Sequence, residues 1–184
     1  MDHYELEHCL GFIKSLGFEN PECLKFGSLA YRAFKDGEVY VLKTATRNWP
    51  SYLEHVSNEK YILERIKSIP KIVSMKEYHV GRYDSIDAAA LVRDYIEGKT
   101  VEETKALNPA QCQSIEAAIL ALHDLGIADL DIAGKNIVVD TEGIPWLIDL
   151  GTATTKERSR SFNVLKYEDL LRMESMFGMY CRSR

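Results

Sequence analysis

The segment at residues 129–151, which reads DLDIAGKNIVVDTEGIPWLIDLG, constrains the fold more than any other part of the chain. Two apolar runs at residues 137–139 and 144–148 flank the polar residues 140–143, a pattern typical of a β-hairpin with a tight turn. Asp131 and Asn136 precede this hairpin, and Asp149 follows it. We therefore expect the acid after the hairpin to face the acid and the amide on the loop before it.

These three side chains suit a magnesium site that serves phosphoryl transfer. Carboxylate and amide oxygens are hard ligands of the kind that Mg²⁺ binds in proteins. Phosphoryl transfer uses such ligands to hold the metal and a further carboxylate to orient the attacking hydroxyl group. The segment therefore indicates transfer of a phosphoryl group to a hydroxyl.

Composition predicts a globular chain with its own hydrophobic core. Of the 184 residues, 46% are hydrophobic and 28% are charged, which is the balance of one domain, with room for two small lobes. The net charge of −5 argues against general nucleic-acid binding. The sequence contains no long apolar run, so we expect no membrane span. The four cysteines show no CxxC spacing, which favours reduced thiols and a cytoplasmic location.

Hydrophobic periodicity predicts an α+β fold. The Asp36-Gly37 pair is typical of a two-residue hairpin turn, and Ile96-Glu97-Gly98-Lys99 interrupts the pattern as a hinge would. The final helix is expected to bury a face with Leu165, Leu170, Met173 and Phe177. The predicted helices cover residues 3–16, 50–69, 109–125 and 162–180, and the predicted strands lie within residues 23–44, 73–82, 88–95, 137–139 and 144–148.

The spacing of Asp131, Asn136 and Asp149 resembles the catalytic loop and the metal-binding DFG segment of the protein-kinase-like superfamily. The resemblance implies that Asp131 is the catalytic aspartate, that Asn136 and Asp149 bind the metal, and that Lys135 neutralises the γ-phosphate during transfer. The cofactors it implies are ATP and Mg²⁺, with Mn²⁺ as a substitute.

The first half of the chain resembles the nucleotide-binding half of the same superfamily. Val41-Leu42-Lys43 resembles its third-strand lysine motif, which implies that Lys43 holds phosphates. Glu59 is the candidate partner of that lysine and is preferred to Glu64 on the same predicted helix. The resemblance also gives nucleotide-binding positions to Gly27 and Ser28, at the place of the glycine-rich loop, and to the backbone of Arg93, Asp94 and Tyr95, at the adenine edge.

In outline the chain is similar to the compact atypical kinases, such as RIO kinases, the small kinases associated with tRNA modification, and lipopolysaccharide sugar kinases. This similarity implies a single bilobal domain over residues 1–184, with a leading helix at 3–16, a small antiparallel-sheet N-lobe at about 18–96 and a reduced, mainly helical C-lobe at about 97–184. A reduced C-lobe also leaves surface for a protein partner.

Two departures from the family pattern keep other functions open. Residues 129–131 read Asp-Leu-Asp where the family has His-Arg-Asp, and the glycine-rich loop is represented by Gly27 and Ser28. We expect a minimal Ser/Thr protein kinase. The alternatives are a kinase for a small hydroxylated molecule or a sugar, and a pseudokinase or ATPase module that acts through a partner.

Overall fold

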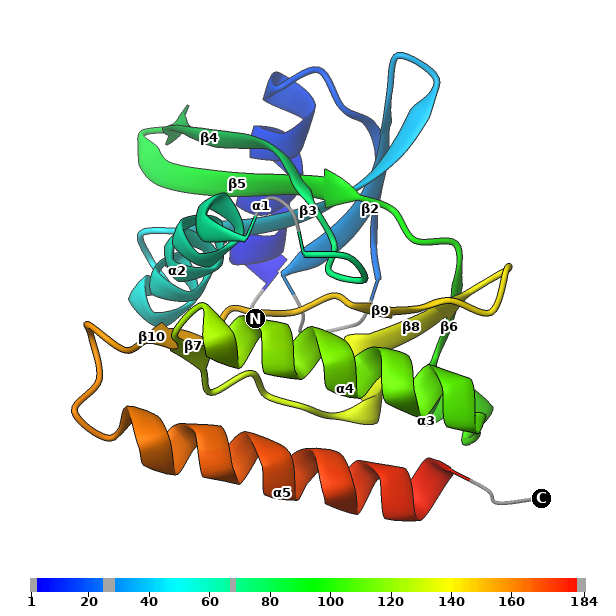
Figure 1. Cartoon of the computed structure of the whole chain (residues 1–184). Helices are drawn as coiled ribbons and strands as arrows, with labels where there is room; N and C mark the ends of the chain where they lie inside the picture. The colour runs from blue at the N-terminus through cyan, green and yellow to red at the C-terminus, as the bar shows by residue number, and fades with distance from the viewer. Residues whose placement is uncertain (1–2, 25–28, 67–68, 182–184) are drawn as a thin grey trace. The chain divides into compact units, whose positions relative to one another are not determined.

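The computed structural model describes residues 3–24, 29–66 and 69–181, which form two compact units. Unit 1 comprises Met1–Tyr61 and Ser74–Tyr95, and unit 2 comprises Ile62–Val73 and Ile96–Arg184. Each unit contains both helices and strands (Figure 1). The α+β class predicted from the sequence is confirmed, whereas the kinase-like arrangement of two lobes stays a prediction.

Unit 1 is built on a five-stranded antiparallel sheet with the order β1-β2-β3-β5-β4. The predicted hairpin turn is confirmed, because Lys35 pairs with Glu38 while Asp36 and Gly37 both adopt positive φ angles, 54° and 82°. The strands are β1 (Glu19–Cys23), β2 (Ala30–Lys35), β3 (Glu38–Thr46), β4 (Met75–Tyr83) and β5 (Ile86–Asp94).

Helix α1 (His3–Ser15) supplies the apolar side chains that pack on this sheet. Cys9 and Ile13 of α1 are fully buried with Tyr31 and Leu42 of the sheet. This cluster fixes β2 and β3, the strands that lead to the candidate lysine. The predicted helix at 3–16 is thereby confirmed, and it forms part of the core of unit 1.

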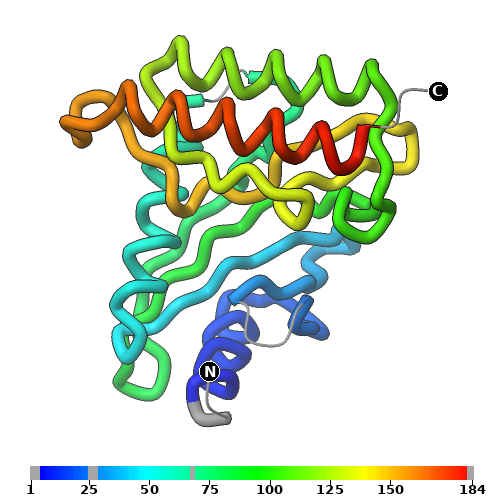
Figure 2. The backbone as a smooth tube through the Cα atoms, turned by 90° about the horizontal axis from the view of Figure 1, so that it is seen from below, coloured from blue at the N-terminus to red at the C-terminus, as the bar shows by residue number. Residues whose placement is uncertain are grey.

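Unit 2 combines three helices with short strands. Helices α4 (Pro109–Asp124) and α5 (Phe162–Tyr180) run side by side (Figures 1 and 2). A capping box between Asn108 and Gln111 begins α4, and Gly126, with a φ angle of 74°, follows its end. The other elements are α3 (Val101–Thr104), β6 (Gly98–Thr100), β7 (Ile127–Ala128), β8 (Ile137–Asp140), β9 (Pro145–Leu147), β10 (Thr154–Thr155) and the short 3₁₀ helix η1 (Gly134–Asn136).

The hairpin predicted around residues 140–143 is confirmed as β8 and β9. The expected hinge at 96–99 is different in the structure, because Gly98 begins β6, which pairs with β8. A Cβ atom at Gly98 would overlap the carbonyl oxygen of Val139. Glycine is therefore required by a close strand contact there, which local periodicity does not reveal.

Two predicted helices need correction. Helix α2 (Pro50–Arg65) ends before residue 69, the end expected from the apolar pattern. The buried face of α5 consists of Phe162, Asp169, Met173 and Met176, so Leu165, Leu170 and Phe177 are only half-buried. The prediction was based on apolar residues alone, and it misplaced the buried face because Asp169 occupies a central position on it.

Candidate functional site

A buried charge cluster in unit 1 joins Lys43, Glu59 and Arg93. The Nζ atom of Lys43 lies 2.6 Å from Oε2 of Glu59, and Nη1 of Arg93 lies 2.5 Å from Oε1 of the same carboxylate. Side-chain exposure is 1% for Glu59, 4% for Arg93 and 15% for Lys43. Of the two carboxylates considered in α2, Glu59 is thus the one that Lys43 contacts, whereas Glu64 is exposed.

Strand register explains how the two cations reach one carboxylate. Lys43 of β3 pairs with Leu91 of β5, and Arg93 follows Leu91 by two positions. Residues two apart on a strand point to the same face, so both cationic side chains leave the sheet on one side. Glu59 meets them there from helix α2.

The remaining predicted nucleotide contacts of unit 1 are backbone groups at 93–95 and the segment at 27–28. Gly27 and Ser28 lie outside the described residues. The carboxylate of Asp94 accepts a hydrogen bond from Ser74 Oγ and pairs with Lys76 at 3.0 Å. The Arg32 guanidinium stands 6.0 Å from the centre of the Tyr95 ring. These contacts hold the side chains at the end of β5.

In unit 2, the loop before β8 brings Asp131, Lys135 and Asn136 together. The Nδ2 group of Asn136 donates to both the backbone carbonyl and the carboxylate of Asp131, each at 2.9 Å. Lys135 Nζ lies 3.4 Å from the same carboxylate. The side chains of Asp131 and Lys135 are about half exposed, at 44% and 51%, so a ligand can reach them.

Asp149 follows β9 and lies next to a residue that is bonded to Asn136. The backbone amide of Ile148 donates to the carbonyl oxygen of Asn136 at 3.0 Å, and Asp149 Oδ1 accepts from the amide of Gly151 at 3.0 Å. Asn136 uses its Nδ2 group toward Asp131, which leaves Oδ1 as its oxygen for a ligand. An amide oxygen and a carboxylate are two ligands of the kind that Mg²⁺ binds, and Mg²⁺ commonly completes its shell with phosphate oxygens and water.

The described residues contain no group of three or more His, Cys, Asp or Glu side chains arranged to hold a metal ion by themselves. The structure joins no two of the cysteines Cys9, Cys23, Cys112 and Cys181 in a disulfide.

Asp169 is a residue of this site that the sequence analysis missed. Its carboxylate, fully buried on α5, accepts hydrogen bonds at 2.9 Å from the backbone amides of Asp129 and Leu130. His123 of α4, also buried, contacts the same carboxylate through Nε2 at 3.0 Å. An aspartate on the apolar stripe of a helix was the available sequence signal, since buried acids are rare unless bonded.

The turn that Asp169 holds has an uncommon backbone. Asp129 and Asp131 adopt left-handed φ angles of 63° and 43°, which residues other than glycine seldom do. Further contacts fix Asp129, because its carbonyl oxygen accepts from Thr152 Oγ1 at 2.9 Å and its carboxylate faces Arg172 at 3.5 Å. The surrounding contacts thus hold the Asp131 backbone in a conformation that local preference disfavours.

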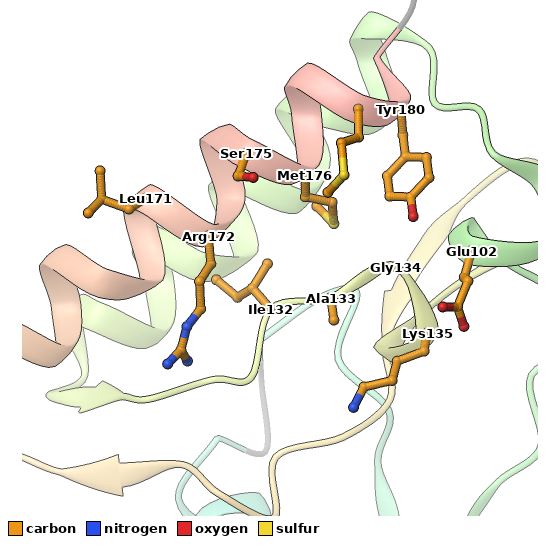
Figure 3. Close-up of a pocket in the computed structure, with 11 residues that line it drawn as sticks. Glu102, Ile132, Ala133, Gly134, Lys135, Leu171, Arg172, Ser175, Met176 and Tyr180 are labelled. Atoms are coloured by element: carbon orange, nitrogen blue, oxygen red, sulfur yellow. The ribbon is translucent and has the colours of Figure 1, made fainter.

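A cavity of about 420 Å³ in unit 2 adjoins this turn (Figure 3). Its floor is the segment from Ile132 to Lys135, and one wall is α5 with Arg172, Met176 and Tyr180. Lys135 lines the cavity, and its Nζ atom contacts Asp131. The cavity therefore begins beside the carboxylate at which the sequence predicts catalysis.

Comparison with known proteins gives a partial match to a kinase. No protein-family model matches the chain. A protein of Caenorhabditis elegans named "Putative tyrosine-protein kinase C03B1.5" is 39% identical over 49 residues. The match covers 27% of this chain and 15% of that protein, so this chain spans only a small part of its length. This similarity supports a kinase-like chain and nothing finer.

Among the residues that the structure describes, no helix is both long enough and apolar enough to cross a membrane.

Proposed function

We propose that this chain is an ATP-dependent phosphotransferase that moves the γ-phosphate of ATP to a hydroxyl group. In this proposal Lys43 binds the nucleotide phosphates, Glu59 holds Lys43, and Asn136 and Asp149 bind Mg²⁺. Asp131 accepts the proton of the attacking hydroxyl, and Lys135 stabilises charge on the transferred group. Bound Mg²⁺ would neutralise the phosphate oxygens.

The observation that carries the proposal is the 2.6 Å pair of Lys43 and Glu59. A lysine held by a buried carboxylate has a fixed direction, and its ammonium is the more exposed of the two cations in the cluster. A positioned ammonium suits the binding of phosphate oxygens. The partial kinase match supports the same function.

The geometry of unit 2 supports the remaining roles. Asn136 orients the Asp131 carboxylate through a 2.9 Å hydrogen bond, which is what a group that must meet a hydroxyl requires. Lys135 lies 3.4 Å from that carboxylate and is half exposed, so it can turn toward a phosphoryl group. Both side chains stand on a turn that the contacts of Asp169 hold in place.

We propose a Ser or Thr side chain of a protein as the acceptor. Pockets for small molecules usually enclose most of their ligand. The cavity beside Asp131 instead has open apolar walls, since Leu171 is 46% exposed and Met179 is 64% exposed. Such walls suit an apolar side chain that a larger acceptor presents next to its hydroxyl.

Transfer of radiolabelled γ-phosphate from ATP tests the proposal, with Mg²⁺ or Mn²⁺ and with the protein itself and a generic protein as acceptors. We expect metal-dependent label on protein that Asp149→Ala abolishes and that Asp124→Ala retains, because Asp124 is an exposed residue of α4 outside the site. Label on a small hydroxylated compound alone would overturn the protein acceptor. Metal-dependent ATP binding without any transfer would overturn the phosphotransferase.

A further inference from the structure

We infer that Arg93 is a positioning residue that makes the Lys43 site selective for polyphosphate over uncharged ligands. The inference rests on the proposed function, because it concerns how the same site binds its nucleotide. The sequence assigned Arg93 only a backbone contact at the adenine edge. The structure instead places its side chain in the charge cluster, 2.5 Å from Glu59.

The charge of the cluster favours an anionic ligand. A lysine and a glutamate alone sum to zero charge, so much of the field of Lys43 would be cancelled by its own partner. Here Oε1 of Glu59 accepts from Arg93 and Oε2 accepts from Lys43, so each carboxylate oxygen has its own cation. The three groups together carry one net positive charge. At a site of low exposure such a charge favours an anionic ligand strongly.

Burial and strand position give the two cations of the cluster different roles. Arg93 is 4% exposed and Lys43 is 15% exposed, so Lys43 is the cation that meets a ligand and Arg93 acts through Glu59. Arg93 sits within β5, an inner strand of the sheet that pairs with both β3 and β4. The planar guanidinium on this rigid strand fixes one oxygen of Glu59 and thereby the direction of the other. Glu59 then holds Lys43 in place before any nucleotide binds.

The experiment compares the affinities of ATP and adenosine by isothermal titration calorimetry in Mg²⁺ buffer. Adenosine shares the base and sugar of ATP and lacks its phosphates, so it reports the site without the charge effect. We expect Arg93→Met to weaken ATP binding by about tenfold, the effect of one charge-assisted contact, and to change adenosine binding by less than about twofold. Arg93→Lys keeps the charge and should restore most of the ATP affinity.

Arg82→Met is the matched control, since Arg82 is a 70% exposed arginine of β4 that pairs with Asp87 at the surface. It should leave both affinities unchanged. Should Arg93→Met fail to fold, Arg93→Gln makes the same comparison with a hydrogen-bond donor retained.

Two results would overturn the inference: equal weakening of ATP and adenosine, which indicates a purely structural role, or unchanged ATP affinity. Failure of the proposed function is distinguishable, because it would appear in the wild-type protein, either as binding of neither ATP nor adenosine or as ATP binding without transfer of the γ-phosphate.

Discussion

The buried carboxylate of Asp169 accepts a hydrogen bond at 2.9 Å from the backbone amide of Leu130, a residue 39 positions earlier in the chain. The other oxygen of the same carboxylate accepts from the amide of Asp129. One side chain of α5 thus sets the backbone that carries Asp131. The site proposed for catalysis depends on a helix that contributes no group to the chemistry.

Replacing Asp169 should therefore loosen the turn and destabilise unit 2. Asp169→Ala leaves the buried amide of Leu130, the partly buried amide of Asp129 and His123 without their acceptor, so we expect the free energy of unfolding to fall by about 3 kcal/mol. Asp169→Asn keeps one acceptor oxygen and should cost less. Urea denaturation measures both values. Hydrogen exchange should be faster at Asp129 and Leu130 in either variant, and unchanged exchange there would contradict the assigned role.

Alanine variants of Asp131 and Asp149 should lose different properties of the protein. Asp131→Ala removes the proposed proton acceptor and should lower the transfer rate by about 1,000-fold while ATP affinity stays near that of the wild type. Asp149→Ala removes a proposed metal ligand and should also abolish the dependence of ATP affinity on Mg²⁺. Calorimetric titration with and without Mg²⁺ separates the two. Identical behaviour of the variants would refute the division of roles.

Replacement of two glycines by alanine should change the free energy of unfolding in opposite directions. In Gly98→Ala the new methyl group would meet the backbone of Val139 and Asp140, so β6 must move and we expect a loss of about 2 kcal/mol. Gly178 in α5 has no atom within 4 Å of such a group, and helix propensity predicts a gain of about 0.5–1 kcal/mol. Thermal unfolding of the two variants checks both signs. A stabilised Gly98→Ala would show that β6 is displaced at no cost.

The protein should lose stability as the pH rises above 9. Burial, together with the charge of Glu5, raises the pKa of the Cys9 thiol from 9.0 to about 12, and a hydrogen bond with Tyr31 opposes the shift only in part. The unfolded chain releases this proton near pH 9 while the folded chain keeps it, so the unfolded state binds fewer protons and stability falls between pH 9 and 12.

Urea midpoints at pH 8 and pH 10.5 measure that loss. Between pH 8 and pH 10.5 the urea midpoint of Cys9→Ala should decrease less than that of the wild type. Cys23, whose side chain is exposed, provides the control. The urea midpoint of Cys23→Ala should decrease as much as that of the wild type. Equal decreases in all three proteins would contradict the role of Cys9. Burial likewise raises the pKa of Cys112 to about 12, so some loss should persist without Cys9.

Local patterns in the sequence predicted most elements of the fold. The final helix was predicted at 162–180 and is observed at Phe162–Tyr180, because its periodicity is sustained over several turns. The Asp36-Gly37 turn was predictable because few residue pairs tolerate two positive φ angles. Strands β1 and β6 were missed, since both are short and their pairing partners are distant in the sequence or weakly patterned.

Contacts of the candidate site between residues of one short segment were predictable from their spacing. Contacts between distant segments were not. Asp131 and Asn136 lie five residues apart on one loop, and the structure brings them into contact. The contact of Glu59 with Lys43 was expected from the resemblance to the protein-kinase-like superfamily. The contacts of Arg93 and Asp169 join separate elements, and a single sequence contains no signal that pairs them.

The dependence of the Asp131 turn on α5 has a consequence for protein synthesis. Chains emerge from the ribosome from the N-terminus onward, and early segments fold as soon as their contacts are available. Thr152 and Asn136 can contact the turn at Asp129 and Asp131 early, but the amides of Asp129 and Leu130 lack their acceptor until Asp169 has left the exit tunnel. Nascent chains that stop before α5 can therefore form the sheet of unit 1 but lack two of the hydrogen bonds that order the proposed catalytic turn, so we expect the proposed activity to rise once that helix has been translated.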